Sequence, residues 1–184
     1  MWGQEKARTC GALRPYKMEG RCGMKIVASR VDERLVHGQI MTSWAKYLKL
    51  RRIVVVDDQV AKDEFMATVL GMSAPAGISI DILSVADAAS RIQSDKSDEN
   101  AMLLFKRISA ALELAKLLAG TPNELKELNL GNLGSVPGRT QITKNIFLSD
   151  EEKDEVRELR GMGVNVFLQM LYTDAAVPSA DVIG

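Results

Sequence analysis

Short apolar runs alternate along the chain with segments in which apolar side chains recur every three or four positions. The runs at 25–29, 53–56 and 102–105 are typical of strands buried on both faces. Residues 78–82 alternate apolar and polar side chains instead, which predicts an edge strand exposed on one face. The helical spacing predicts helices at about 38–49, at about 61–72, from Ser84 onward and from Ile108 to Gly120.

The last third of the chain carries a clear helix-start signal. Ser149 and Glu152 have the spacing of a capping box, so the last predicted helix begins there. We expect it to end at Gly161 and Gly163, because glycine commonly ends helices. The other features predicted for this part are a strand at 128–130, a glycine-rich turn at 131–134, one or two short strands within 140–148 and a final strand at 164–168.

Strands separated by helices of roughly 10–15 residues indicate βαβ units. We therefore expect an α/β fold in a single domain at 24–184, with an open, mostly parallel central β-sheet and helices on both faces. In such sheets, ligands bind beyond the carboxyl ends of the strands, where loops lead into helix N-termini. This rule directs attention to the loop after the first strand, to Asp57 at the end of the second, and to the loops after Phe105 and Leu130.

Residues 1–23 differ from the rest of the chain. They carry more basic than acidic side chains, have neither helical nor strand periodicity, and lack the apolar core of a signal peptide. The pattern becomes strand-like from Met24 onward. We expect the segment to be an unstructured leader or a mis-assigned start, with Met24 as the natural start. A functional basic arm is the alternative.

The composition narrows the possible functions. The 184 residues include 24 Lys and Arg against 24 Asp and Glu, so a net charge of zero gives no field to attract a nucleic-acid backbone. The apolar runs are far shorter than the ~20 residues of a membrane helix. Both cysteines, Cys10 and Cys22, precede the domain, and His37 is the single histidine, so we expect no metal site.

The candidate chemistry lies in residues 30–39, which we call the His37 loop. His37 stands where the loop meets a predicted helix, and the free N–H groups of a helix start can hold an anion. Arg34 has a planar fork suited to two phosphate oxygens. Asp32 is placed to accept a proton from one ring nitrogen and leave the other as the nucleophile, and Gly38 allows close approach. These parts suit an imidazole that takes and gives a phosphoryl group.

Plainer interpretations of the same loop stay open. A single histidine at a helix start is often a capping or partly buried polar residue. Arg30 and Arg34 also suit a solvated charged loop paired with Asp32 and Glu33, and Asp32 is a common turn residue. The position at the ligand-binding edge of the sheet favours the functional interpretation but does not settle it.

Two weaker motifs lie at the same edge. Asp57 and Asp58 suit Mg²⁺ binding or phosphoryl acceptance, as in receiver domains, but the further carboxylate and lysine of that class do not assemble here. A substrate-loop or helix-capping role is therefore favoured for this pair. Residues 131–134 suit a second backbone wall of a phosphate pocket, and a plain turn is the alternative.

The His37 loop, Arg-Val-Asp-Glu-Arg-Leu-Val-His-Gly-Gln with Trp44 following, strongly resembles the first loop of a family of phosphocarriers. These are the IIB components of the mannose/fructose/sorbose family of the bacterial phosphoenolpyruvate-dependent sugar phosphotransferase system. The resemblance covers about 24–175, and the sequence departs from the family pattern at Glu33, at Asn132 and after Asp174. Beyond the His37 loop, the segments that carry the resemblance are 54–58, 74–77, 103–105, 129–132 and 144–166.

The resemblance implies that His37 is the phosphorylated residue. A IIA domain would pass its phosphoryl group to His37, which would donate it to a sugar of the mannose, fructose, sorbose or N-acetyl-hexosamine class. Arg34 would contact the phosphoryl group, and Asp32 would set the loop and the imidazole. We expect the phosphate and substrate contacts to come from Arg30, Gly38, Gln39, Asp57, Gly131 and Asn132.

The resemblance also implies an activity and a set of partners. The chain would be a protein-N(pi)-phosphohistidine–sugar phosphotransferase that needs no metal, nucleotide or other cofactor. Its partners would be the IIA domain, the membrane subunits IIC and IID that carry the sugar, and a second copy in a homodimer. We expect a cytoplasmic protein, peripherally associated with the membrane permease. The alternative is a regulatory or binding module of the same fold that does not transfer phosphoryl groups to sugar.

Overall fold

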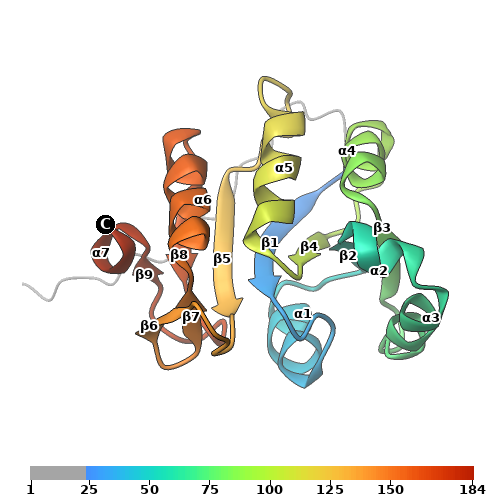
Figure 1. The fold of residues 1–184 in the computed structure, drawn as a ribbon. Helices are drawn as coiled ribbons and strands as arrows, with labels where there is room; N and C mark the ends of the chain where they lie inside the picture. Colours follow the sequence, from blue (N-terminus) through green and yellow to red (C-terminus); the bar gives the residue numbers. More distant parts are fainter. Residues whose placement is uncertain (1–23) are drawn as a thin grey trace, which may run out of the picture.

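Parallel strands form a seven-stranded sheet at the centre of residues 24–184, the part of the chain that this computed structural model describes (Figure 1). The expected leader, 1–23, lies outside the described residues. The strand order is β3-β2-β4-β1-β5-β8-β9, and only the pairing of β8 with β9 is antiparallel. The sheet strands are β1 (Ile26–Asp32), β2 (Arg52–Val56), β3 (Ser79–Leu83), β4 (Ala101–Phe105), β5 (Glu127–Asn132), β8 (Asn165–Leu168) and β9 (Val177–Pro178).

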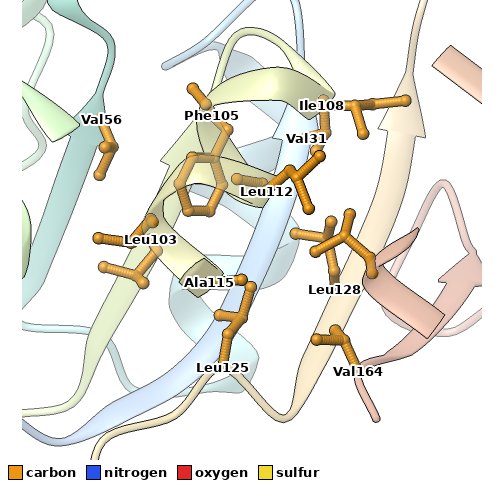
Figure 2. Packing of buried hydrophobic residues seen from close by; sticks show 14 of the residues in the cluster. Val31, Val56, Leu103, Phe105, Ile108, Leu112, Ala115, Leu125, Leu128 and Val164 are labelled. Carbon is orange, nitrogen blue, oxygen red and sulfur yellow. The ribbon is translucent and has the colours of Figure 1, made fainter. Parts of the chain in front are cut away.

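Helices cover both faces of this sheet, as expected. One apolar cluster joins the first face to α4, α5 and α6, and a second joins the other face to η1, α1, α2 and α3. Figure 2 shows Leu112 and Ala115 of α5 packed between Leu103 and Phe105 of β4 and Leu128 of β5. The helices are η1 (Ile40–Trp44), α1 (Ala45–Tyr47), α2 (Asp58–Lys62), α3 (Glu64–Met72), α4 (Val85–Ser94), α5 (Ile108–Leu118), α6 (Asp150–Gly161) and α7 (Ala180–Ile183).

Two predicted helices differ in detail from their expectation. The helix expected at about 38–49 contains a π-helical segment, η1, before α1 completes it. The helix expected at about 61–72 is two helices, because Asp63 interrupts it with an extended backbone. The Asp63 carboxylate accepts a hydrogen bond from the N–H of Met66 at 3.0 Å and so starts α3 afresh.

The C-terminal third contains the largest departures. Residues Gly131 and Asn132 belong to β5, so the turn predicted to begin at 131 is wrong: the strand continues because β1 pairs with it as far as Asn132. The strand predicted as final, β8, is followed by β9 and α7. By contrast, the capping box of Ser149 and Glu152 at the start of α6 is confirmed.

Outside the main sheet, β6 (Thr140–Thr143) and β7 (Ile146–Leu148) form an antiparallel hairpin. This confirms the short strands expected within 140–148. Leu133 bridges Ile146, so the hairpin lies against the end of β5. The edge position expected for residues 78–82 is also confirmed, since β3 is the outermost strand on its side. None of the helices described for 24–184 has the length and apolar character needed to cross a membrane.

Asp95 at the end of α4 makes a contact whose strength depends on pH. Partial burial tends to raise the pKa of its carboxyl, but hydrogen bonds from Ser97 and Arg52, and the charge of Arg52, hold the pKa at about 2. The ordinary value is 3.8, so the folded state favours the ionised form. This contribution to stability is present above about pH 4 and is lost as the pH falls toward 2.

We therefore expect Asp95→Asn to lower the melting temperature at pH 7. The difference from the unmodified protein should shrink between pH 4 and pH 2, which melting curves at several pH values would measure. Asp98→Asn is the control, because the Asp98 side chain is 95% exposed and its ion pair with Lys25 spans 3.5 Å. A difference for Asp95→Asn that is independent of pH would contradict the assignment.

Candidate functional site

The His37 loop leaves the carboxyl end of β1, near the middle of the sheet. β1 lies between β4 and β5 in the sheet. Strands β2, β3 and β4 all lie on one side of β1, and the chain crosses to the other side when it continues from β4 to β5. The strand order therefore reverses at β1, which is where open α/β sheets bind ligands. The arrow of β1 in Figure 1 points toward this loop and toward α1.

Asp32 is the centre of the loop's hydrogen-bonding network. Its carboxylate is completely buried at the end of β1. It accepts hydrogen bonds from Arg30 Nη2 at 2.9 Å, from the Arg34 backbone N–H at 3.2 Å, and from Arg34 Nε and Nη2 at 3.0 and 3.1 Å. A buried carboxylate is stable only when paired and hydrogen-bonded, and two guanidinium groups meet that need here.

Arg30 supports the loop from beneath. Its side chain is completely buried, lies 5.0 Å from the ring centre of Trp44, and donates to the Asn129 side chain and to the Gln169 carbonyl. Burial lowers the pKa of Arg30, while the charge and hydrogen bond of Asp32 oppose that effect. We expected Arg30 to line the phosphate pocket, but its complete burial places it under Asp32 instead.

Gly131 is required by this buried guanidinium. A Cβ at position 131 would lie 1.9 Å from Arg30 Cζ, so any side chain there would displace Arg30. Gly131 and Asn132 end β5, and Asn132 is the register partner of Asp32. The structure therefore places both of these expected residues beside the His37 loop, with Gly131 in contact with Arg30.

His37 lies just before η1, and its two ring nitrogens have different surroundings. Nδ1 lies 2.7 Å from the Leu35 carbonyl oxygen, so Nδ1 carries a proton and donates it in this arrangement. Nε2 is buried, has no hydrogen-bond partner, and lies 3.8 Å from Asp32 Oδ2. Leu35 has a φ of 54°, a left-handed conformation that is uncommon for a residue with a side chain and that directs attention to this turn.

Arg34 is the exposed cation of the loop. Its side chain is 39% exposed, and its Nη2 also contacts Gln39 Oε1 at 3.2 Å and Met170 Sδ at 3.9 Å. Gly38, at the start of the helical segment, has open space where a Cβ would lie. The structure thus brings Asp32, Arg34, Gln39 and His37 together, as the sequence predicted.

Asp57 lies at the same edge of the sheet but has other partners. Its carboxylate accepts hydrogen bonds from the N–H groups of Gln59 and Val60 at 2.9 and 3.0 Å and so caps α2. It also pairs with Arg107 Nη2 at 3.0 Å. These contacts agree with the helix-capping role considered for Asp57: one carboxylate oxygen caps α2 and the other pairs with the residue that precedes α5.

Several contributing residues were not expected from the sequence. Asn129 on β5 and Gln169 after β8 hold Arg30 in place, and the Met170 sulfur contacts both arginines of the loop. The sequence offers one sign of such a role, which is the polar Asn129 between two leucines in a strand predicted to be buried. Within 24–184 no group of three or more His, Cys, Asp or Glu side chains is arranged to hold a metal ion.

The arrangement suits transfer of an anionic group. A protonatable imidazole, a buried carboxylate, an exposed guanidinium and a helix start converge within one loop. The guanidinium can contact phosphate oxygens in a bidentate way, and the helix start favours negative charge. The carboxylate can hold one imidazole nitrogen while the other forms a bond.

Comparison with known proteins agrees with this geometry. A sequence model of the family described as "PTS system sorbose subfamily IIB component" matches residues 26–184, so the match includes the segment after Asp174 where we expected a departure. The sorbose-specific EIIB component of Lacticaseibacillus casei is 35% identical over 162 residues, which cover 88% of this chain and 94% of that protein. The mannose-specific EIIAB component of Escherichia coli (strain K12) is 29% identical over 162 residues, 88% of this chain and 49% of that longer protein.

A solved structure shows the same fold. The IIBSor domain of the sorbose permease from Klebsiella pneumoniae superposes with a TM-score of 0.80 at 31% identity, covering 87% of this chain and 96% of that chain. The family match and the structural match extend over nearly all of the described residues. The chain therefore belongs to the sorbose subfamily of phosphotransferase system IIB components, which transfer phosphoryl groups during sugar uptake.

Proposed function

We propose that His37 is the residue of this IIB component that carries the phosphoryl group. It accepts the group from a phosphohistidine of a IIA domain and passes it to a hydroxyl of the incoming sugar. In the first step a nitrogen–phosphorus bond forms at His37 as the one in the donor breaks. In the second, that bond breaks and a phosphorus–oxygen bond forms. The supporting observation is that the single histidine and the exposed Arg34 both lie against the buried Asp32 carboxylate.

Each neighbouring residue has a distinct part in this proposal. Arg34 contacts the phosphoryl oxygens, because its guanidinium is the exposed cation of the loop. The backbone at Gly38 and the side chain of Gln39 line the site at the helix start. Arg30 does not contact the phosphoryl group but holds Asp32, and Asp32 orients the imidazole.

The acceptor atom in this proposal is Nδ1, the N(pi) nitrogen. Nε2 is buried and faces the Asp32 carboxylate, so an incoming phosphorus atom cannot approach it in this arrangement. The tautomer protonated at Nε2 would direct that proton toward Asp32 and leave a lone pair on Nδ1. Nδ1 must then leave the Leu35 carbonyl oxygen, which accepts its hydrogen bond here at 2.7 Å.

The partners follow from the same proposal. The donor is a IIA domain, and the match to 49% of a protein whose name combines A and B components supports this pairing. The acceptor sugar is presented by IIC and IID membrane subunits, with which this chain associates peripherally. The sugar belongs to the mannose, fructose, sorbose or N-acetyl-hexosamine class, and the protein acts as a homodimer.

Transfer from a purified phosphorylated IIA domain tests this function. We expect one phosphoryl group per chain, which remains in the absence of membrane subunits and is discharged when IIC, IID and their sugar are added. Nitrogen-15 NMR of the phosphorylated ring should show phosphorus coupled to Nδ1. Label that is never discharged to sugar would contradict the transfer role, and coupling to Nε2 would contradict the choice of nitrogen alone.

A further inference from the structure

Glu33 directs its side chain toward the segment that joins β5 to the β6–β7 hairpin. It follows Asp32 in a tight turn, in which the Leu35 N–H donates to the Asp32 carbonyl at 2.9 Å. Its backbone N–H donates to the Asn132 carbonyl at the end of β5 at 3.1 Å. Its carboxylate accepts hydrogen bonds from the Gly134 N–H at 2.7 Å and from Arg139 Nη1 at 3.3 Å. The turn that precedes His37 is thus joined to residues about a hundred positions away in the chain.

Arg139 connects this contact to α6. Its Nε and Nη2 atoms bind both carboxylate oxygens of Glu152, at 2.8 and 2.5 Å, and its Nη1 also donates to the Gly134 carbonyl at 2.9 Å. The Arg139 side chain is only 13% exposed. Hydrogen bonding to Glu152 raises the pKa of Arg139, and Glu33 adds to that effect. Since Glu152 belongs to the capping box of α6, Arg139 has a fixed support on its far side.

Gly134 lies directly against the Glu33 carboxylate. A Cβ at this position would lie 2.4 Å from Glu33 Oε1, so the Glu33 carboxylate occupies the space where a side chain would be. The carboxylate therefore sits directly against the backbone after β5, while its charge pairs with Arg139. Asp32 and Arg34, on either side of Glu33 in the chain, are the residues that hold the site around His37.

We propose that Glu33 and Arg139 are positioning residues for phosphoryl transfer: together they hold the turn of the His37 loop against the β6–β7 hairpin and α6. This inference rests on the function proposed for His37. Neither residue touches the reacting atoms. Their contact fixes the backbone between Asp32 and Arg34, and small displacements of groups in a transfer site slow the chemical step.

Two substitutions disturb this contact in different ways. Glu33→Gln keeps the length and an oxygen for the Gly134 N–H but removes the charge that pairs with Arg139, and it leaves the Arg139–Glu152 pair intact. Gly134→Ala keeps every charge but forces the Glu33 carboxylate off the Gly134 N–H. Gly161→Ala is the matched control, because a Cβ there meets nothing within 4 Å.

The measurement is the single-turnover rate of transfer from phosphorylated IIA over a range of IIA concentrations, well below the melting temperature of each variant. We expect Glu33→Gln and Gly134→Ala each to lower the saturating rate about tenfold, with the half-saturating concentration unchanged. Adding Arg139→Gln to Glu33→Gln should slow transfer no further than Arg139→Gln alone, since both changes break the same contact. Gly161→Ala should match the unmodified protein.

Saturating rates within twofold of normal in both variants would overturn the inference, as would a change in the half-saturating concentration alone. A lower melting temperature with a normal saturating rate would mean that the contact only stabilises the fold, and this result would also overturn the inference. These outcomes assume that the unmodified protein is labelled at His37. If it is not, the proposed function itself fails and this inference fails with it, so the two failures are distinguishable.

Discussion

His37→Ala is expected to abolish phosphorylation of this chain by phosphorylated IIA. The imidazole is the only one in the sequence, and it shares the buried Asp32 carboxylate with the exposed Arg34. In the unmodified protein the label should be acid-labile and base-stable, as a phosphoramidate is. Gel electrophoresis or mass spectrometry of the phosphorylated chain over a time course would measure the loss of phosphorylation.

The same substitution should leave the protein folded. Its main loss is the hydrogen bond from Nδ1 to the Leu35 carbonyl, worth about 1 kcal/mol, and Nε2 has no hydrogen-bond partner to lose. A melting curve close to that of the unmodified protein is therefore the control. Label that persists in folded His37→Ala would place the acceptor on another residue and contradict the proposal.

Arg34→Gln is expected to slow phosphoryl transfer about a hundredfold. An oriented donor that acts on charge as it moves in the transition state is typically worth ~3 kcal/mol. The side chain is 39% exposed, and Asp32 keeps Arg30 as a partner when Arg34 is removed, so the cost in stability should be about 1 kcal/mol or less. Arg34→Lys keeps the charge but not the fork, and it should recover only part of the rate.

The chain offers a close control for this substitution. Arg107 is 40% exposed and pairs with the buried carboxylate of Asp57, much as Arg34 pairs with that of Asp32. Arg107→Gln therefore removes an equivalent charge and ion pair from a different buried carboxylate. We expect near-normal single-turnover rates for Arg107→Gln. Near-normal rates for Arg34→Gln as well would mean that backbone amides alone hold the phosphoryl group.

Local signals in the sequence were sufficient to predict most of the fold. The apolar runs place the inner strands, and the capping box of Ser149 and Glu152 places the start of α6. These features depend on neighbouring residues and on a repeating pattern of burial, both of which a sequence displays directly. The His37 loop was found for the same reason, because its reacting groups are close together in the chain.

The burial of Arg30 was not predicted, because it depends on distant residues. A charged side chain in β1 between β4 and β5 contradicts ordinary strand preference, and Asn129, Gln169 and the absence of a side chain at Gly131 make it possible. Nothing near Arg30 in the sequence indicates these partners.

The contact between Glu33 and Arg139 was missed on similar grounds. These residues are 106 positions apart, and either one alone is typical of an exposed loop. Their pairing follows from the position of the β6–β7 hairpin against the end of β5, which neither apolar periodicity nor turn residues specify. Pairings between distant segments are the part of a fold that a single sequence shows least.

β9 bears on how readily the protein aggregates rather than on how it reacts. It occupies the free hydrogen-bonding edge of β8, where an unpaired strand would be a template for pairing with another molecule. Pro178 of β9 has no N–H to donate to a further strand. On the opposite edge, β3 carries Asp81, whose charge pairs with Arg52 on β2. With a proline on one edge and an aspartate on the other, the sheet is poorly suited to growing strand by strand into an aggregate.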